Sequence, residues 1–305
     1  MARDPSHTPA ASGRTPRIRK AIITAAGLGT RFLPVTKAQP KEMLPLVDKP
    51  TIQYSVEEAI ASGIEDVIMV TGGGKRAIVD HFDRSREIEF YLQARGKDDL
   101  LAILAEVDAL TDKVHLCFVQ QKEPLGLGNA VYQAHNLVEG EAVAVLLPDD
   151  VILAATPCLK QLMDAHEASG GATVLACRRV PRNQISRYGI LATGASRGPL
   201  HEVVDMVEKP DPDSAPSDLA IFGRYVLAPD VFAALHRAEV GAGGEVQLTD
   251  AIKRTIGAGR VVALEFEGDY YDTGTIPDYL KSNLALALKR PDLREEMLRV
   301  IRELA

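Results

Sequence analysis

Near its N-terminal end the chain reads Ala21-Ile22-Ile23-Thr24, followed directly by Ala25-Ala26-Gly27-Leu28-Gly29-Thr30-Arg31. The first four residues have the continuous apolar, β-branched character of a strand that is covered on both faces. The small residues after it allow backbone N–H groups to come close to an anion, so they have the composition of a phosphate-binding loop. Taken alone, the same glycines could equally form a tight connection between a strand and a helix.

Two common phosphate-binding motifs are disfavoured at this loop. The dinucleotide-binding fingerprint Gly-x-Gly-x-x-Gly requires a third glycine, and Phe32 stands there instead. A Walker A motif ends in Gly-Lys-Ser/Thr, which neither this loop nor the glycine-rich stretch 72–76 contains. The sequence therefore argues against a Rossmann dehydrogenase and against a P-loop kinase or ATPase.

Beyond the loop, short apolar runs alternate with helical patterns, which is typical of a mainly parallel sheet covered by helices on both faces. The predicted fold class is α/β. The expected strands are 21–24, 67–71, 114–120, 143–147, 173–176 and 260–266. Apolar residues share one face of 51–62, and Gly63 follows as a helix terminator, so a helix is expected there. A second helix is expected to start with Thr156 as N-cap and Pro157 as its first residue.

The remaining segments suggest appended elements around one large domain, although the length would also suit two domains. We expect a disordered tail over 1–19, a catalytic domain over 20–274 and a C-terminal helical arm over 275–305 that serves packing or dimerisation. Within the domain, we expect a helical excursion at 84–110. Residues 181–216 are predicted to form a glycine- and proline-rich insertion that borders a pocket and holds a short β-like run at 200–207.

Composition excludes several classes of protein. The 305 residues are 46% hydrophobic and 25% charged, as in ordinary globular domains. Lys and Arg number 35 against 42 Asp and Glu, giving a net charge of -7, so nucleic acid is not an expected partner. No stretch approaches the ~20 apolar residues of a transmembrane helix and no secretory signal is recognisable, so we expect a cytoplasmic protein without a membrane partner. Three dispersed cysteines are expected to be reduced core residues: Cys117, Cys158 and Cys177.

Three cationic residues lie at the end of the glycine loop or shortly after it. Prolines interrupt residues 32–46 and prevent a long helix, which leaves Arg31, Lys37 and Lys41 near the loop. An Arg offers a planar fork to phosphate oxygens and a Lys offers a point charge, so the group suits a polyphosphate. A solvated basic loop is the alternative explanation.

The loop belongs to a longer run that resembles the signature of the sugar-1-phosphate nucleotidyltransferases. The matching segments follow in order and cover nearly all of the chain after Lys20: Ala25–Lys37, Pro40–Pro45, Asp48–Pro50, Gln121–Gly128, Leu147–Asp150, Glu208–Pro210, Gln247–Ala251 and Tyr271–Gly274. Within the family, the chain is most similar to bacterial enzymes that use UTP and glucose 1-phosphate. The resemblance implies a Rossmann-like mixed, mainly parallel sheet, the fold of nucleotide-diphospho-sugar transferases.

The resemblance also assigns a metal site. Asp149 follows the predicted strand 143–147, at the carboxyl end where α/β sheets bind ligands. Mg²⁺ prefers few protein carboxylates together with phosphate oxygens and water. By resemblance, Asp149 and Asp272 hold a catalytic Mg²⁺. From its position the Asp149 carboxylate suits a metal, with a turn residue as the alternative. From spacing alone, Asp272 would be read as a turn residue.

The resemblance distributes the other roles. An amide side chain at Gln121 can pair with the edge of a uracil, and the resemblance implies that Gln121 and the Gly126 backbone read the pyrimidine. In the same way, Glu208 is expected on the glucose hydroxyls, with Gly189 as a backbone contact. Further contacts to the nucleotide are implied for Ala25, Ala26, Gly27, Gly29 and Glu42. The residues implied to stabilise charge during the reaction are Arg31, Lys41 and Lys209, the last holding the sugar phosphate.

The implied reaction is transfer of UMP from UTP to glucose 1-phosphate, giving UDP-glucose and pyrophosphate. The attacking phosphate has a second pKa of ~6, so it is largely ionised at neutral pH and needs no general base. A thymidylyltransferase or guanylyltransferase that acts on another sugar 1-phosphate is the alternative within the class. A non-catalytic regulatory homologue that binds nucleotide sugars is the alternative outside it. We expect a homodimer or homotetramer.

Overall fold

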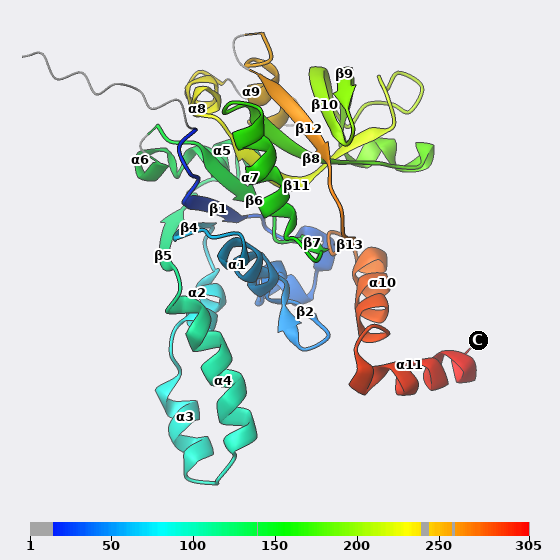
Figure 1. The fold of residues 1–305 in the computed structure, drawn as a ribbon. Helices are drawn as coiled ribbons and strands as arrows, with labels where there is room; N and C mark the ends of the chain where they lie inside the picture. Colours follow the sequence, from blue (N-terminus) through cyan, green and yellow to red (C-terminus); the bar gives the residue numbers. More distant parts are fainter. Residues whose placement is uncertain (1–14, 139, 239–243, 258–259, 305) are drawn as a thin grey trace, which may run out of the picture.

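A mixed sheet of nine strands forms the centre of the structure, a computed structural model that describes residues 15–304 apart from 139, 239–243 and 258–259 (Figure 1). The strand order is β5-β4-β1-β6-β11-β8-β12-β10-β9. The strands span β1 Lys20–Ala25, β4 Asp66–Thr71, β5 His115–Gln120, β6 Val143–Leu146, β8 Thr173–Arg179, β9 Gly189–Arg197, β10 Leu200–Glu208, β11 Leu219–Leu227 and β12 Val261–Glu265.

The two halves of the sheet differ in strand direction. β5, β4, β1 and β6 are parallel, so the strand that precedes the glycine loop lies between two parallel neighbours. β11 is antiparallel to both β6 and β8, and β9 and β10 form an antiparallel hairpin beside β12. The α/β class is confirmed. The sheet is mixed, with parallel pairing throughout its first half and again between β8 and β12 in its second.

Helices cover both faces of the sheet, as Figure 1 shows. One buried apolar cluster packs α1 and α7 on one face, and another packs α5, α8 and α9 on the other. Alternate residues of β1 contribute to the two clusters, because Ile23 belongs to the first and Ile22 to the second. The α-helices span α1 Thr51–Ala61, α2 Arg76–Phe82, α3 Arg86–Gln93, α4 Asp98–Thr111, α5 Leu127–Tyr132, α6 His135–Val138, α7 Cys158–Ala168, α8 Pro229–His236, α9 Leu248–Lys253, α10 Ile276–Ala287 and α11 Pro291–Leu304.

Two small sheets lie beside the main one. β2 (Pro45–Leu46) pairs with β3 (Lys49–Pro50). β7 (Asp150–Leu153) pairs antiparallel with β13 (Asp269–Asp272), and this register sets Asp150 opposite Asp272. Segments that lie far apart in the sequence are therefore joined next to the carboxyl end of β6.

The predicted helical excursion at 84–110 is confirmed. α3 and α4 form a hairpin that projects from the body of the molecule at the bottom of Figure 1. It carries exposed apolar side chains, among them Phe90, Tyr91 and Ile103.

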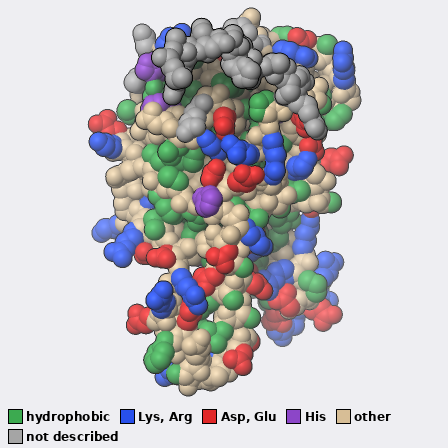
Figure 2. All heavy atoms as spheres, turned by 60° about the vertical axis from the view of Figure 1, so that its left-hand side comes forward, with side chains coloured by type: hydrophobic (Ala, Val, Ile, Leu, Met, Phe, Trp, Pro, Cys, Tyr) green, Lys and Arg blue, Asp and Glu red, His purple; other side chains and the backbone are tan. Residues whose placement is uncertain are grey.

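On the face of the molecule drawn in Figure 2, Lys and Arg side chains are interspersed with Asp and Glu. Within the described ranges, no helix combines the length and the apolar character needed to cross a membrane.

Several sequence-based predictions need correction. Strand β5 is not doubly covered, because it forms an edge of the sheet, and Cys117 on it is exposed whereas Cys158 and Cys177 are buried as predicted. Pro157 has an extended ψ of 138° and caps α7, so the helix begins at Cys158 rather than at Pro157. Residues 189–208 are not a separate insertion, since β9 and β10 extend the main sheet.

The structure describes part of each predicted terminal segment. Ile18, assigned to the tail, is buried in a core cluster, and Arg17 Nη2 donates to the Gly63 carbonyl at 2.8 Å. Residues 1–14 lie outside the described part of the chain. At the other end, α10 packs on the body, since Ser282 Oγ donates to the Asp272 carbonyl at 2.7 Å. α11 buries none of its residues.

Candidate active site

Two cavities meet at the carboxyl end of β6. The first, of about 480 Å³, lies between the glycine loop, the Lys41 turn and residues 121–130. The second, of about 530 Å³, lies between Arg31, the β9–β10 hairpin and residues 270–275. Asp149 and Leu147 line both of them. A ligand that fills both cavities would therefore pass over the Asp149 carboxylate.

The predicted site residues divide between these cavities according to their predicted roles. The first cavity receives the residues expected at the nucleotide: Ala26, Gly27, Gly29, Lys41, Glu42, Gln121 and Gly126. The second receives Arg31 and the residues expected at the sugar phosphate and the metal: Gly189, Glu208, Lys209 and Asp272. Ala25 lines neither cavity, because it is the last residue of β1 and is fully buried in the core.

The glycine loop does not lead into an α-helix, so the alternative of a strand-to-helix connection is wrong. Three short 3-10 turns follow it: Thr30–Phe32, Val35–Lys37 and Lys41–Met43. Gly29 has a φ of 66°, and a Cβ there would lie 3.1 Å from Thr36 Cγ2. Thr36 Oγ1 also donates to the Gly29 carbonyl at 2.8 Å. This packing holds the loop open toward the first cavity and requires glycine at position 29.

Of the three cations expected near the loop, two reach the cavities. Lys41 lines the first cavity and Arg31 the second, where Arg31 Nη1 lies 3.5 Å from the Gly274 carbonyl. Lys37 is exposed and lines neither cavity.

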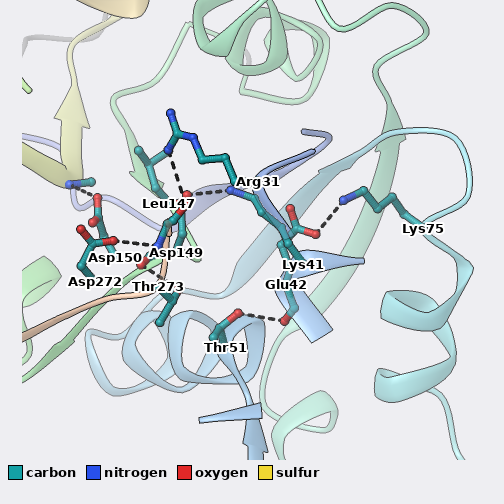
Figure 3. Close-up of polar contacts among 12 residues, drawn as sticks. Arg31, Lys41, Glu42, Thr51, Lys75, Leu147, Asp149, Asp150, Asp272 and Thr273 are labelled. Atoms are coloured by element: carbon teal, nitrogen blue, oxygen red, sulfur yellow. Dashed lines mark hydrogen bonds and ion pairs between the residues drawn. The ribbon is translucent and has the colours of Figure 1, made fainter. Parts of the chain in front are cut away.

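Lys41 is bound to Asp149 at the junction of the cavities, with Nζ 2.6 Å from Oδ2 (Figure 3). Burial acts to lower the pKa of Lys41, but the charges of Asp149 and Glu42 outweigh it and raise that pKa. The pKa of Asp149 is lowered, although burial acts to raise it, because Lys41 is so close. Lys41 is therefore a cation and Asp149 an anion across the neutral pH range.

The second predicted metal ligand faces the same space. Gly274 N donates to Asp272 Oδ1 at 2.7 Å and Arg187 Nη2 to Asp272 Oδ2 at 2.7 Å. A Cβ built on Gly274 would lie 3.1 Å from Asp272 Oδ1 and 3.9 Å from Asp149 Oδ2, so both carboxylates border one point. Thr273 N and Oγ1 each donate to the Asp149 carbonyl at 2.9 Å, which joins the two segments directly.

These carboxylates fit a Mg²⁺ ion that also binds phosphate. Two carboxylate oxygens on one side leave the other positions to substrate oxygens and water, as Mg²⁺ prefers. Within the part of the chain that the structure describes, no three His, Cys, Asp or Glu side chains form a metal-binding group. The donor set thus suits a metal shared with a phosphorylated substrate rather than one enclosed by protein.

Sequence reasoning missed Asp150, although the Asp149-Asp150 doublet was visible. Its Oδ2 accepts from Gly223 N at 2.9 Å and its Oδ1 from Tyr270 OH, so it anchors three segments. Burial and the charge of Asp149 raise the pKa of Asp150 to about 7. A side chain at Gly223 would collide with Asp150 and with Leu147, whose Cβ would be 2.7 Å away. Asp150 therefore joins these segments while it also lines the second cavity.

Lys75 is a second residue that the sequence did not single out. Its Nζ donates to Glu42 Oε2 at 2.7 Å in a pair that is almost fully buried (Figure 3). The Thr51 hydroxyl fixes the same turn through the Glu42 carbonyl at 2.9 Å. Burial raises the pKa of Glu42, while Lys75 and Lys41 act to lower it. The turn that carries Lys41 is thus held by charge as well as by its backbone.

At the far end of the second cavity, Glu208 is the last residue of β10 and stands opposite Gly189 of β9. Thr249 Oγ1 donates to Glu208 Oε2 at 2.7 Å, and Lys209 Nζ lies 3.2 Å from Glu208 Oε1. Lys209 has a φ of 45°, which a residue with a side chain rarely adopts. Such backbone strain is concentrated at functional sites. Both Glu208 and Lys209 line the second cavity.

Two cavities that adjoin at a carboxylate beside a glycine loop are the arrangement that a nucleotide-dependent transferase requires. A family model described as nucleotidyl transferase matches residues 20–289, and the chain belongs to that family. The chain is 49% identical over 288 residues to UTP--glucose-1-phosphate uridylyltransferase of Staphylococcus haemolyticus, with 94% of this chain and 99% of that protein covered.

Solved structures agree with this placement. UTP-bound UDP-glucose pyrophosphorylase from Acinetobacter baumannii is 38% identical with a TM-score of 0.85, covering 94% of this chain and 100% of that one. A UDP-glucose pyrophosphorylase complexed with UDP-glucose is 37% identical with a TM-score of 0.81, covering 90% of this chain and 100% of that one. The fold and the family therefore agree with the resemblance drawn from the motifs.

Proposed function

We propose that this chain transfers UMP from UTP to α-D-glucose 1-phosphate and releases pyrophosphate, forming UDP-glucose. The observation that carries the proposal is the junction of the two cavities at Asp149 and Lys41. On one side stands an amide suited to a pyrimidine, Gln121, and on the other a carboxylate and ammonium pair suited to a sugar phosphate, Glu208 and Lys209. The named relatives, which use UTP or UDP-glucose, support the choice of uridine and glucose.

In this mechanism, the reacting phosphates meet at the junction. The glucose 1-phosphate oxygen attacks the α-phosphorus of UTP while the bond to the β-phosphate oxygen breaks and pyrophosphate leaves with that oxygen. Lys41 and Arg31 stabilise negative charge at the α-phosphoryl and on the departing pyrophosphate, because fixed cations are worth most in a site with little water. Lys209 holds the attacking phosphate, and Glu208 orients the sugar through its hydroxyls.

Asp149 and Asp272 are the residues that would hold Mg²⁺. When bound, the ion neutralises phosphate charge and orients the α-phosphoryl group. Lys41 keeps Asp149 ionised for this role, since their atoms are 2.6 Å apart. Arg187, Gly274 and Ser282 keep the Asp272 segment in place through its carboxylate and its carbonyl.

We propose a cytoplasmic enzyme that acts as a homodimer or homotetramer. We also propose that α10 belongs with the catalytic unit, because Tyr279 OH donates to the Pro45 carbonyl at 2.7 Å and Asn283 Oδ1 accepts from Val47 N at 2.7 Å. In that division, α11 alone is the arm.

A panel of nucleoside triphosphates against sugar 1-phosphates, read by pyrophosphate release, tests this function. UTP with glucose 1-phosphate is expected to give the highest kcat/KM. A higher value for a thymidine or guanosine nucleotide with another sugar phosphate would instead identify the alternative transferase. Binding of UDP-glucose without turnover of any pair would point to a regulatory homologue.

A further inference from the structure

The side-chain amide of Gln121 is held in one orientation in the first cavity, where the pyrimidine is proposed to bind. Its backbone N donates to the Thr71 carbonyl at 2.8 Å, which fixes the residue just beyond β5. Its Nε2 donates to the Gly126 carbonyl at 3.2 Å and to Asn129 Oδ1 at 2.8 Å. Because a backbone carbonyl can only accept, the nitrogen of this amide has to face Gly126 and Asn129.

Asn129, in the first turn of α5, is fixed in the same way. Gln133 Nε2 lies 3.4 Å from the Asn129 backbone carbonyl, which requires the nitrogen of Gln133 on that side, and 3.3 Å from Asn129 Oδ1. Two amide nitrogens therefore approach the Asn129 side chain, and only its oxygen can lie between them. Asn129 thus offers an acceptor to Gln121.

The remaining atom of the amide is left for a ligand. Gln121 is only 6% exposed and lines the first cavity. Across residues 15–304 with the gaps named above, its Oε1 receives no hydrogen bond. A fixed acceptor in this position suits a base that presents a donor. The N3 of uracil carries a hydrogen, whereas the N3 of cytosine is itself an acceptor.

We propose that Asn129 is a specificity-determining residue, which orients the Gln121 amide so that the site accepts a hydrogen bond from N3–H of uracil and rejects cytosine. Asn129 does so without touching the base. The inference rests on the proposed function in one respect, that a pyrimidine nucleotide binds in the first cavity. It makes no distinction between uracil and 5-methyluracil, because both carry the same N3–H group.

The test compares wild type, Asn129→Leu and Asn129→Asp by calorimetric Kd for UTP, CTP and 5-methyl-UTP in the absence of a sugar phosphate. Leu has a similar volume but no acceptor, whereas Asp keeps the acceptor. We expect the preference for UTP over CTP to fall about tenfold in Asn129→Leu, the equivalent of one net hydrogen bond. We expect Asn129→Asp to keep the wild-type preference, and the ratio of UTP to 5-methyl-UTP to stay constant in all three proteins.

Three outcomes would overturn the proposal: an unchanged UTP over CTP ratio in Asn129→Leu, an equal fall in both variants, or a uniform loss of affinity for all three nucleotides. The last would mean that Asn129 only shapes the cavity. If Asn129→Leu does not fold, Asn129→Ala is measured instead, with the same expectation. If no UDP-glucose is formed but the UTP over CTP preference still falls in Asn129→Leu and not in Asn129→Asp, the proposed reaction is contradicted and this inference is supported.

Discussion

Replacement of Lys41 by methionine removes the cation at the junction of the two cavities and preserves much of the side-chain volume. Lys41 Nζ is 2.6 Å from Asp149 Oδ2, and the two side chains are 24% and 31% exposed. Two unit charges ~4 Å apart interact by about 4 kcal/mol at an effective dielectric constant of ~20, which suits such a partly enclosed pair. The phosphoryl oxygens that would pass over this junction would interact with Lys41 at a similar effective dielectric constant.

Lys41→Met is expected to slow the reaction. Loss of one fixed charge that stabilises a transition state typically costs about 3 kcal/mol of barrier, so kcat should fall roughly a hundredfold. The pKa of Asp149 should also rise, because Lys41 is the main group that lowers it against burial. Lys41→Arg, which restores a cation without the same length, should recover part of the loss.

The assay is steady-state pyrophosphate release from UTP with glucose 1-phosphate at saturating substrate, together with the thermal midpoint of each variant. Lys37→Met is the matched control, because Lys37 belongs to the same segment but is exposed and lines neither cavity. Its kcat should remain within about twofold of wild type. A Lys41→Met protein with kcat within about threefold of wild type would refute the role given to Lys41, as would an equal loss in Lys37→Met.

Three further predictions concern the support of the site. Arg224→Met should lower the free energy of unfolding by about 3–5 kcal/mol in denaturant titrations, because Arg224 is fully buried and its loss leaves Glu58 without its ionic partner. Gly223→Ala should cost about 1–3 kcal/mol by the same measurement and also reduce kcat, since the added methyl group would displace Asp150. Lys209→Met should raise KM for glucose 1-phosphate at least tenfold while changing KM for UTP little.

Each of these three variants has a result that would contradict its prediction, and Arg224→Met also has a compensating double variant. Combining Arg224→Met with Glu58→Gln should recover part of the lost stability, because the uncompensated charge is removed while an amide oxygen can still accept from Leu159 N. A single Arg224→Met as stable as wild type would show that the ion pair does not hold β11 under the site. A Gly223→Ala protein with normal stability and turnover would mean that the space beside Asp150 is larger than in this structure. An equal rise in both KM values for Lys209→Met would contradict its assignment to the sugar phosphate.

The predictable part of the fold is the part that is written locally in the sequence. Three strands of the parallel half of the sheet, β1, β4 and β6, are short and almost continuously apolar. That local pattern was enough to predict them. β11 was missed, although all nine of its residues are buried. Arg224 lies in its middle and looks like a surface residue until Glu58, 166 residues away, supplies the carboxylate. No local pattern contains that partner.

The candidate site shows the same division. The glycine loop and the place of Asp149 after a strand follow from local sequence. The approach of Asp272 depends on the pairing of β13 with β7, and only the family resemblance indicated it. The burial of Ala25 at the end of β1 and the exposure of Lys37 were not readable from local sequence. Asp150 and Lys75 were not predicted because their roles consist of contacts with distant segments.

The most direct test of the central claim, that one product spans both cavities across Asp149, is a crystal structure of the protein with UDP-glucose and Mg²⁺. The account predicts the uracil beside Gln121 and Gly126, the diphosphate at the junction near Lys41, and the glucose hydroxyls within hydrogen-bond distance of Glu208. Product bound in one cavity only, or with its diphosphate away from the Asp149 junction, would contradict it.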